Sequence, residues 1–185
     1  MSKISFRRME LEEAAQMLPQ LFEILYDNMS VIAPTGDSFE EDRNMWLAYC
    51  VPALKEPQRE MLLVYVGAVL AGYIQYRISE ETLFVEEVEL KREYHRTLVF
   101  YRTCLYLLGN LPETVRYVEA YVRKENTYSM ALQQKLGIKR IGENRTGNSW
   151  HYRGTRDAVS AVFPGLGQST VDTLRPKFYN RERQN

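Results

Sequence analysis

Hydrophobic and polar positions follow a helical spacing early in the chain and an alternating one further on. Residues 4–9 alternate as a short strand does, and residues 11–30 carry apolar side chains three and four positions apart, as a helix does. Pro19 interrupts that helix, so a kink or two helical pieces are expected. Ser38 begins a second helical pattern, and Glu41 three residues later completes a capping box. The chain is therefore predicted to open with a strand and two helices.

The rest of the pattern predicts strands separated by shorter helices. Gly67 marks a tight turn between two strands, and Asn126 and Gly137 mark the N-cap and the C-cap of a short helix. The later elements are two strands within 61–78, a strand over 83–90, a helix over 96–108, a strand over 115–122, a helix over 126–137 and a hairpin over 138–154. The order β-α-α-β-β-β-α-β-α-β predicts a mixed α/β fold of the α+β type, in which helices flank a mostly antiparallel central sheet.

The patterning weakens near residue 155, which divides the chain. We expect residues 1–154 to form one domain, because they hold all the strongly patterned elements. Residues 155–185 are predicted to be a C-terminal extension or tail, with a short helix over 157–163 and a polar end. The tail could dock on a second copy of the chain, which would make the protein a homodimer.

Composition and charge narrow the class of protein. Hydrophobic residues make up 45% of the chain and charged residues 26%, as in ordinary globular proteins. The 24 basic residues equal the 24 acidic ones, so no overall basic surface for nucleic acid is predicted. Cys50 and Cys104 lack metal-ligand spacing, and no apolar run suits a signal peptide or a membrane span. We expect a cytoplasmic protein that binds no metal, nucleic acid or membrane.

The stretch from residue 85 to residue 110 raises the main question about function. It is predicted as a strand, a sharp turn and a helix, the arrangement that presents helix N–H groups to a phosphate in many folds. Such turns use glycine where the backbone must approach the phosphate closely or adopt a positive φ. This turn contains no glycine. Either the phosphate is held in another way, or the site has been lost.

Three stretches of the chain share the order and the residue types of one known family. The first has a turn glycine before an apolar-apolar-Gly-aromatic step, the second leads from a strand into the turn described above, and the third opens a helix with Asn and ends it with Lys-Leu-Gly. They are residues 67–77 with Gly67, Gly72 and Tyr73, residues 85–94, and residues 125–143 with Asn126, Ala131, Lys135, Leu136 and Gly137. Together they resemble the GNAT acetyltransferase family over residues 4–153. The resemblance implies an acetyl-CoA-dependent N-acetyltransferase, which transfers an acyl group from the CoA thioester to an amine on a small molecule or peptide.

The acetyl-CoA loop departs from the family's pattern, which reads Arg or Gln, two residues, Gly, one residue, and Gly or Ala. Here His95 stands at the first position, and Leu98 and Phe100 stand at the glycine positions. The resemblance implies a pyrophosphate site at His95, Arg96, Leu98, Val99 and Phe100, in which His95 and Arg96 add charge and donors to the backbone N–H groups. In the alternative, Leu98 and Phe100 fill the site, and the chain is a non-catalytic GNAT-like domain that binds a ligand or a partner.

The resemblance also assigns residues to the rest of the cofactor. Val88 and Leu90 would polarise the thioester carbonyl through their backbone N–H groups, and Asn126 would contact the pantetheine. Gln133 stands where the family often has a Tyr that gives a proton to the leaving thiolate, and Gln has no proton to give at neutral pH. Tyr128 could donate that proton instead, or it could be a core or wall residue.

The acetyl acceptor needs a base, for which three carboxylates are available: Glu86, Glu87 and Glu89. Alternation places Glu86 on one face with Phe84, Val88 and Leu90, and apolar neighbours raise the pKa of a carboxyl toward a value useful for a base. Glu86 is therefore the predicted catalytic base, with Glu87 second. The alternative is that these carboxylates are solvated or paired in salt bridges, as carboxylates in a sheet usually are.

Overall fold

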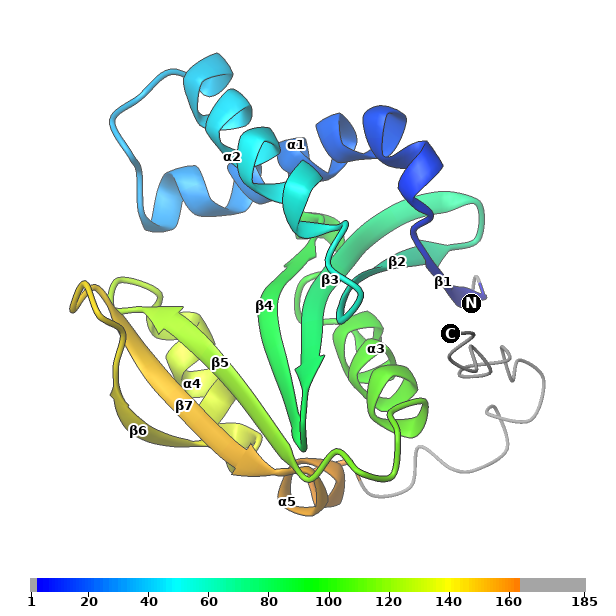
Figure 1. Cartoon of the computed structure of the whole chain (residues 1–185), viewed down its shortest axis with the longest axis vertical. Coiled ribbons are helices and arrows are strands. Elements are labelled where there is room, and N and C mark those ends of the chain that lie inside the picture. The colour runs from blue at the N-terminus through cyan, green and yellow to red at the C-terminus, as the bar shows by residue number, and fades with distance from the viewer. Residues whose placement is uncertain (1–2, 164–185) are drawn as a thin grey trace, which may run out of the picture.

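The computed structural model describes residues 3–163, and within them seven strands form one sheet flanked by helices (Figure 1). The strands are β1 (Ile4–Arg8), β2 (Arg59–Val66), β3 (Val69–Ser79), β4 (Thr82–Leu90), β5 (Tyr117–Arg123), β6 (Lys139–Glu143) and β7 (Ser149–Thr155). The helices are α1 (Ala14–Ile32), α2 (Phe39–Ala53), α3 (Leu98–Gly109), α4 (Thr127–Lys135) and α5 (Arg156–Ala161), with 3-10 turns at Leu11–Glu13 and Arg92–Tyr94. None of these helices is both long and apolar enough to cross a membrane.

The strand order is β1-β2-β3-β4-β5-β7-β6, and every neighbouring pair is antiparallel except β4 and β5. These two strands run parallel and pair only where Thr82–Val85 lies beside Tyr117–Ala120. Beyond Val85, β4 continues to Leu90 without a β5 partner, so the sheet forks. The predicted fold class is confirmed, and the hairpin predicted over 138–154 is formed by β6 and β7, followed by α5.

The helices cover the sheet in two layers (Figure 1). On one face, α1 and α2 bury Leu21 and Trp46 against Leu63 and Tyr73 of β2 and β3. The other face carries α3, α4 and α5. Its core cluster combines residues of the sheet with residues at these helices, among them Leu62, Ile74, Leu83, Leu107, Val118, Leu136, Tyr152 and Val159. Neighbouring residues of β2 and β3 enter opposite clusters because side chains alternate along a strand. Both faces of the central strands are therefore buried.

Helix boundaries follow the predicted capping residues. Ser38 accepts a hydrogen bond from the Glu41 N–H, and the Glu41 carboxylate accepts one from the Ser38 N–H at 2.9 Å, which completes the capping box. Asn126 caps α4 by accepting from the Ser129 N–H at 2.9 Å, and Gly137 follows α4 with φ +71°. The division expected at Pro19 does not occur, because α1 runs unbroken from Ala14 to Ile32. Burial of its apolar side outweighs the missing hydrogen bond of proline, whose cost is about 3 kcal/mol.

The start of the predicted C-terminal extension packs on the core. Thr155 caps α5 by accepting from the Ala158 N–H at 3.2 Å, and Val159 and Phe163 are buried in the same cluster as α3. Residues 164–185 of that extension, including the polar tail, lie outside the described residues.

Gly72 allows β3 and the end of β4 to approach closely. A Cβ atom built there would lie 2.8 Å from the Leu90 Cα and would also overlap the Glu89 carbonyl oxygen. We expect Gly72→Ala to lower the free energy of unfolding by about 1–3 kcal/mol, because two backbones must move apart. Urea unfolding monitored by circular dichroism would measure this loss. Gly109→Ala is the matched control, since a Cβ there meets nothing within 4 Å, and equal stability of the two variants would contradict the close approach.

Candidate active site

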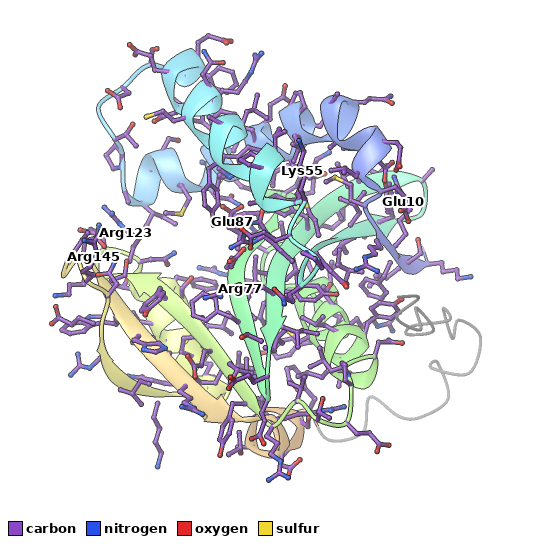
Figure 2. The ribbon with its side chains drawn as sticks, in the orientation of Figure 1. Glu10, Lys55, Arg77, Glu87, Arg123 and Arg145 are labelled. Atoms are coloured by element: carbon purple, nitrogen blue, oxygen red, sulfur yellow. The ribbon has the colours of Figure 1, made fainter. Side chains whose placement is uncertain are left out.

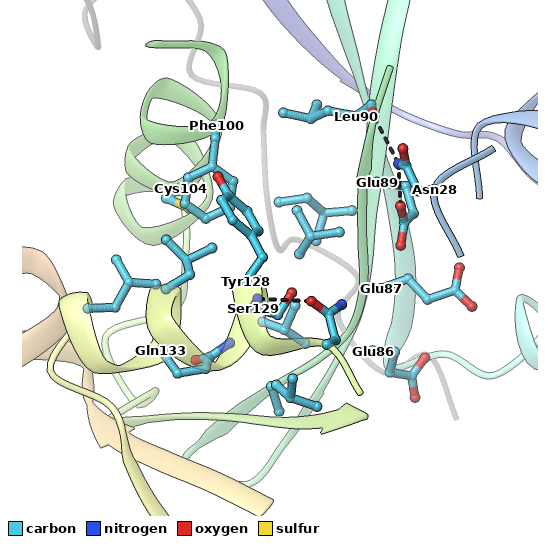
Figure 3. A pocket seen from close by; sticks show the side chains of 18 of the residues that line it. Asn28, Glu86, Glu87, Glu89, Leu90, Phe100, Cys104, Tyr128, Ser129 and Gln133 are labelled. Carbon is cyan, nitrogen blue, oxygen red and sulfur yellow. Dashed lines mark hydrogen bonds between the residues drawn. The ribbon is translucent and has the colours of Figure 1, made fainter. Parts of the chain in front are cut away.

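A cleft opens where β4 and β5 separate. Its volume is about 400 Å³, and its walls come from β4, β5, α3, α4 and the C-terminal part of α1. Figure 3 shows Glu86, Glu87 and Glu89 on one side of β4, and Phe100, Cys104 and Tyr128 on the other. The strand fork therefore creates a passage between two chemically different sides of the sheet.

A β-bulge at Glu86 overturns the predicted faces of β4. Gln75 of β3 pairs with Glu87, while Tyr76 pairs with Val85, so Glu86 is an extra residue on β4. An extra residue shifts the alternation of the side chains that follow it. The prediction that Phe84, Glu86, Val88 and Leu90 share one face is therefore wrong. The Glu86 side chain contacts Gln75 on the face covered by α1 and α2, whereas Val88 and Leu90 pack on the α3 side.

Glu86 is held in a salt bridge. Arg59 donates from Nε to Oε2 and from Nη2 to Oε1, each at 2.7 Å, and the Gln75 amide donates to Oε2 at 2.9 Å. Arg77, which lies on the same face of the sheet as Glu87 (Figure 2), adds a contact from its Nε to Oε1 at 3.4 Å. A bidentate arginine pair fixes an ionised carboxylate. Glu86 is therefore paired in a salt bridge, which is the predicted alternative to its role as the catalytic base.

Glu87 is hydrogen-bonded by two neutral donors. The Trp46 indole N–H donates to Oε1 at 3.0 Å, and the Tyr73 hydroxyl donates to Oε2 at 2.7 Å. Burial raises the pKa of Glu87, while these two hydrogen bonds act in the opposite direction. Both oxygens are therefore positioned by α2 and β3.

Glu89 has the environment expected of a general base. The Asn28 amide of α1 donates to Oε2 at 2.7 Å, and Oε1 has no hydrogen-bond partner among the described residues. Burial raises the pKa of Glu89 to about 8, the nearby Glu87 adds to the rise, and the Asn28 hydrogen bond opposes it. A carboxylate with this pKa can accept a proton near neutral pH. From the sequence, Glu89 was one of three available carboxylates and had no assigned role, because its burial comes from α1, far away in the chain.

The glycine-free turn has a backbone that needs no glycine at the two expected positions. Arg96 takes the left-handed conformation, with φ +59°, and α3 begins two residues later at Leu98. Thr97 caps α3 by accepting from the Val99 N–H at 3.2 Å and donates to the Tyr94 carbonyl at 2.7 Å. His95 Nε2 contacts the Leu90 carbonyl at 2.8 Å, so this nitrogen carries the proton. The positive φ therefore lies at Arg96, whereas Leu98 and Phe100, at the two glycine positions of the family pattern, are ordinary helical residues.

The bulky side chains of this turn leave the cleft open. Leu98 is 49% exposed and does not line the cleft, whereas Phe100 forms part of its wall. Beside them lies a second, more open hollow of about 450 Å³, which Asn28, Val31, Ile32, Arg92, His95 and Arg96 line. Two arginines and a histidine at the N-terminus of a helix form a basic surface suited to an anion.

The wall formed by α4 carries the remaining predicted residues. Tyr128 lines the cleft and is 58% exposed, and Asn126 lines it while capping α4. Gln133 also lines the cleft, and its buried Oε1 has no hydrogen-bond partner among the described residues. His151 lies apart from this wall and is hydrogen-bonded to Glu119 at 2.8 Å.

Comparison with solved structures gives the fold. An acetyltransferase from Thermus thermophilus superposes with a TM-score of 0.64 at 15% identity, over 84% of this chain and 99% of the other. A probable GNAT-family acetyltransferase from Chromobacterium violaceum gives 0.64 at 14% identity, over 86% of each chain. The chain has the GNAT fold. The PaiA N-acetyltransferase from Thermoplasma acidophilum, solved in complex with coenzyme A, shares this GNAT fold with a TM-score of 0.60 at 15% identity, over 83% of this chain and 99% of the other. No protein-family model and no curated protein matches the sequence.

Proposed function

We propose that the chain is an acetyl-CoA-dependent N-acetyltransferase. The observation that carries this proposal is the cleft at the fork of β4 and β5, which joins an apolar side under α3 and α4 to an acidic side under α1 and α2. A thioester needs the first environment for its pantetheine arm, and an ammonium acceptor is attracted by the second. GNAT-fold acetyltransferases among the solved structures support the same conclusion.

The cofactor would enter from the α3 side. Its pyrophosphate would lie at the first turn of α3, where the backbone N–H groups of Leu98, Val99 and Phe100 have no intrahelical acceptor and where His95 and Arg96 line the adjoining hollow. The Val99 N–H already donates to the Thr97 hydroxyl. The side chains of the basic hollow would therefore contribute more to binding the pyrophosphate than they do in a glycine-rich loop.

The thioester would lie against the unpaired edge of β4. Past Val85 this edge has no partner strand, so its backbone N–H groups can polarise a carbonyl; Val88 and Leu90 remain the proposed donors. Asn126 and Tyr128 line the α4 side of the same passage and would contact the pantetheine and the sulfur.

Proton transfer would then proceed through Glu89. Its carboxylate accepts a proton from the bound ammonium group, and the free amine nitrogen attacks the thioester carbonyl carbon. A C–N bond forms and the C–S bond breaks, and the nitrogen gives its second proton, through Tyr128 or a water molecule, to the departing CoA thiolate. A thiolate is a good leaving group because its conjugate thiol has a pKa of about 8.5. Glu86 was the base predicted from the sequence, but its pairing with Arg59 makes Glu89 the better candidate.

Turnover tests this proposal directly. The full chain is mixed with acetyl-CoA and a panel of primary amines, and the release of free CoA thiol is followed together with the mass of the acetylated product. We expect at least one amine to give product at a rate that depends on enzyme concentration. Binding of acetyl-CoA without turnover of any amine would favour the second candidate, a ligand-binding GNAT-like domain, which the replacement of a tyrosine by Gln133 supports.

Arg96 allows the charge and the backbone of the loop to be tested separately. Arg96→Gly removes the charge but suits φ +59°, whereas Arg96→Ala removes the charge and keeps the unfavourable φ. We expect both variants to weaken acetyl-CoA binding about five- to tenfold, equivalent to about 1.0–1.4 kcal/mol. Calorimetry would measure this affinity, and thermal unfolding should show Arg96→Gly to be the more stable of the two. Unchanged affinity in both variants would remove Arg96 from the cofactor site.

A further inference from the structure

The acceptor side of the cleft combines acidic and aromatic groups. Phe84, Glu87 and Glu89 of β4 lie on the face covered by α1 and α2, and Tyr121 of β5 lines the same cleft. Tyr121 is on the face of β5 opposite the buried Val118, Ala120 and Val122. A molecule that reaches the thioester from this side must pass these groups.

The carboxylates on this side differ in whether a cation already neutralises them. Glu86 is paired with Arg59 and Arg77, and Glu119 is paired with His151 and Arg153. Among the described residues, by contrast, the side chains that hydrogen-bond Glu87 and Glu89 are neutral, namely Trp46, Tyr73 and Asn28. Glu87 and Glu89 therefore have no cationic partner among the described residues at the inner end of the cleft, where an incoming ammonium group would pair with their ionised form.

Tyr121 forms an aromatic wall at the mouth of the fork. Its ring centre lies 5.4 Å from that of Phe84 and 4.6 Å from that of His151, and the Glu119–His151 hydrogen bond holds the histidine ring. Despite these neighbours, Tyr121 remains 43% exposed. A large aromatic side chain that lines a cleft and stays exposed offers a surface for the apolar body of a ligand.

The spacing between the two features limits the size of the ligand. Ala120 pairs with Val85, so Tyr121 is level with Glu86, and Glu89 lies three residues further along β4. At the rise of a strand, three residues span about 10 Å along β4. An ammonium group at Glu89 and a ring at Tyr121 can thus belong to one small molecule with a short alkyl chain.

We propose that the acceptor is an arylalkylamine, with its ammonium group at Glu89 and Glu87 and its aromatic ring against Tyr121. This proposal rests on the acetyltransferase function given above. Tyr121 is the specificity-determining residue, and His151 positions its ring. The competing explanation is that Phe84, Tyr121 and His151 form a cross-strand ladder that only stabilises the sheet where the β4–β5 hydrogen bonds end.

Matched amines and matched variants test the proposal. The probes are 2-phenylethylamine and n-hexylamine, which carry the same charge and differ in the ring. For the wild type we expect kcat/KM to be about tenfold higher for the aromatic amine, as one ring-on-ring contact allows. Tyr121→Leu should raise KM for 2-phenylethylamine about five- to tenfold and leave KM for acetyl-CoA unchanged, so the preference disappears. Tyr117→Leu is the control, because Tyr117 lies on the same face of β5 beneath Arg153 and outside the cleft.

Each outcome separates this inference from the function on which it rests. Acetylation of both amines with equal kcat/KM, unaffected by Tyr121→Leu, would overturn the arylalkylamine proposal while the acetyltransferase function stands. A loss of thermal stability in Tyr121→Leu with an unchanged KM would support the structural ladder instead and would also overturn it. Failure of the wild type to bind acetyl-CoA would overturn both proposals.

Discussion

Replacing Glu89 with glutamine is expected to lower kcat by about 10²–10⁴-fold, the range that a positioned general base contributes. The amide keeps the size of the side chain but cannot accept the proton of the ammonium group. Affinity for acetyl-CoA should remain unchanged, because the cofactor phosphates would lie at α3. Steady-state kinetics and calorimetry on the same preparation would measure the two quantities. Loss of turnover in Glu86→Gln, with Glu89→Gln near the wild type, would return the role of base to Glu86.

The pH dependence gives Glu89 a second signature. Wild-type kcat/KM should rise with pH through about 8, where Glu89 loses its proton, and this limb should be absent in Glu89→Gln. Stability should show the opposite trend. The folded-state pKa of this carboxyl lies above its unfolded value, so its contribution is present in full below the unfolded pKa and is lost as pH rises toward 8. Glu89→Gln should therefore be more stable than the wild type at pH 8, and the difference should vanish at pH 4.

The second large effect is expected at Arg59. Its side chain is 9% exposed and that of Glu86 is 11% exposed, so Arg59→Ala leaves a nearly buried carboxylate without its main partner. Removing one partner of a buried pair costs about 3–5 kcal/mol. In a chain of this size that corresponds to a fall in Tm of roughly 6–20 °C. Differential scanning calorimetry would measure it.

The control for Arg59 removes both charges. Arg59→Met combined with Glu86→Met should recover much of the lost stability, since an apolar pair of similar volume needs no ionic partner. If the double variant were as unstable as Arg59→Ala, the instability would come from lost packing of the arginine stem rather than from the stranded carboxylate. If Arg59→Ala were as stable as the wild type, Glu86 would be free to serve another role.

The fold was predictable from the sequence because its signals are local. The capping box at Ser38, the N-cap at Asn126 and the αL glycine at Gly137 each act within one turn of a helix, and the structure confirms all three. Pro19 shows the limit of a local rule, since burial of α1 by tertiary contacts keeps the helix unbroken through it.

The site was less predictable because its geometry depends on pairing and burial. No residue type near Glu86 indicates a bulge, yet the bulge places Val88 and Leu90 on the opposite face of β4 from Glu86, which is held in the Arg59 salt bridge. The environment of Glu89 comes from Asn28, 61 residues away along the chain. The residues predicted for the cofactor are brought together at one cleft and the adjoining basic hollow, apart from Leu98 and Val99, which begin α3. Their roles remain predictions.

The central claim is that the glycine-free turn at α3 still holds the phosphates of acetyl-CoA, because its strained φ lies at Arg96 and its cleft is open. Calorimetric titration of the full chain with acetyl-CoA, with free CoA alongside, tests this most directly. We expect saturable one-site binding of both ligands, weakened in Arg96→Ala. Absence of binding at about millimolar ligand, which corresponds to less than about 4 kcal/mol of affinity, would contradict the account.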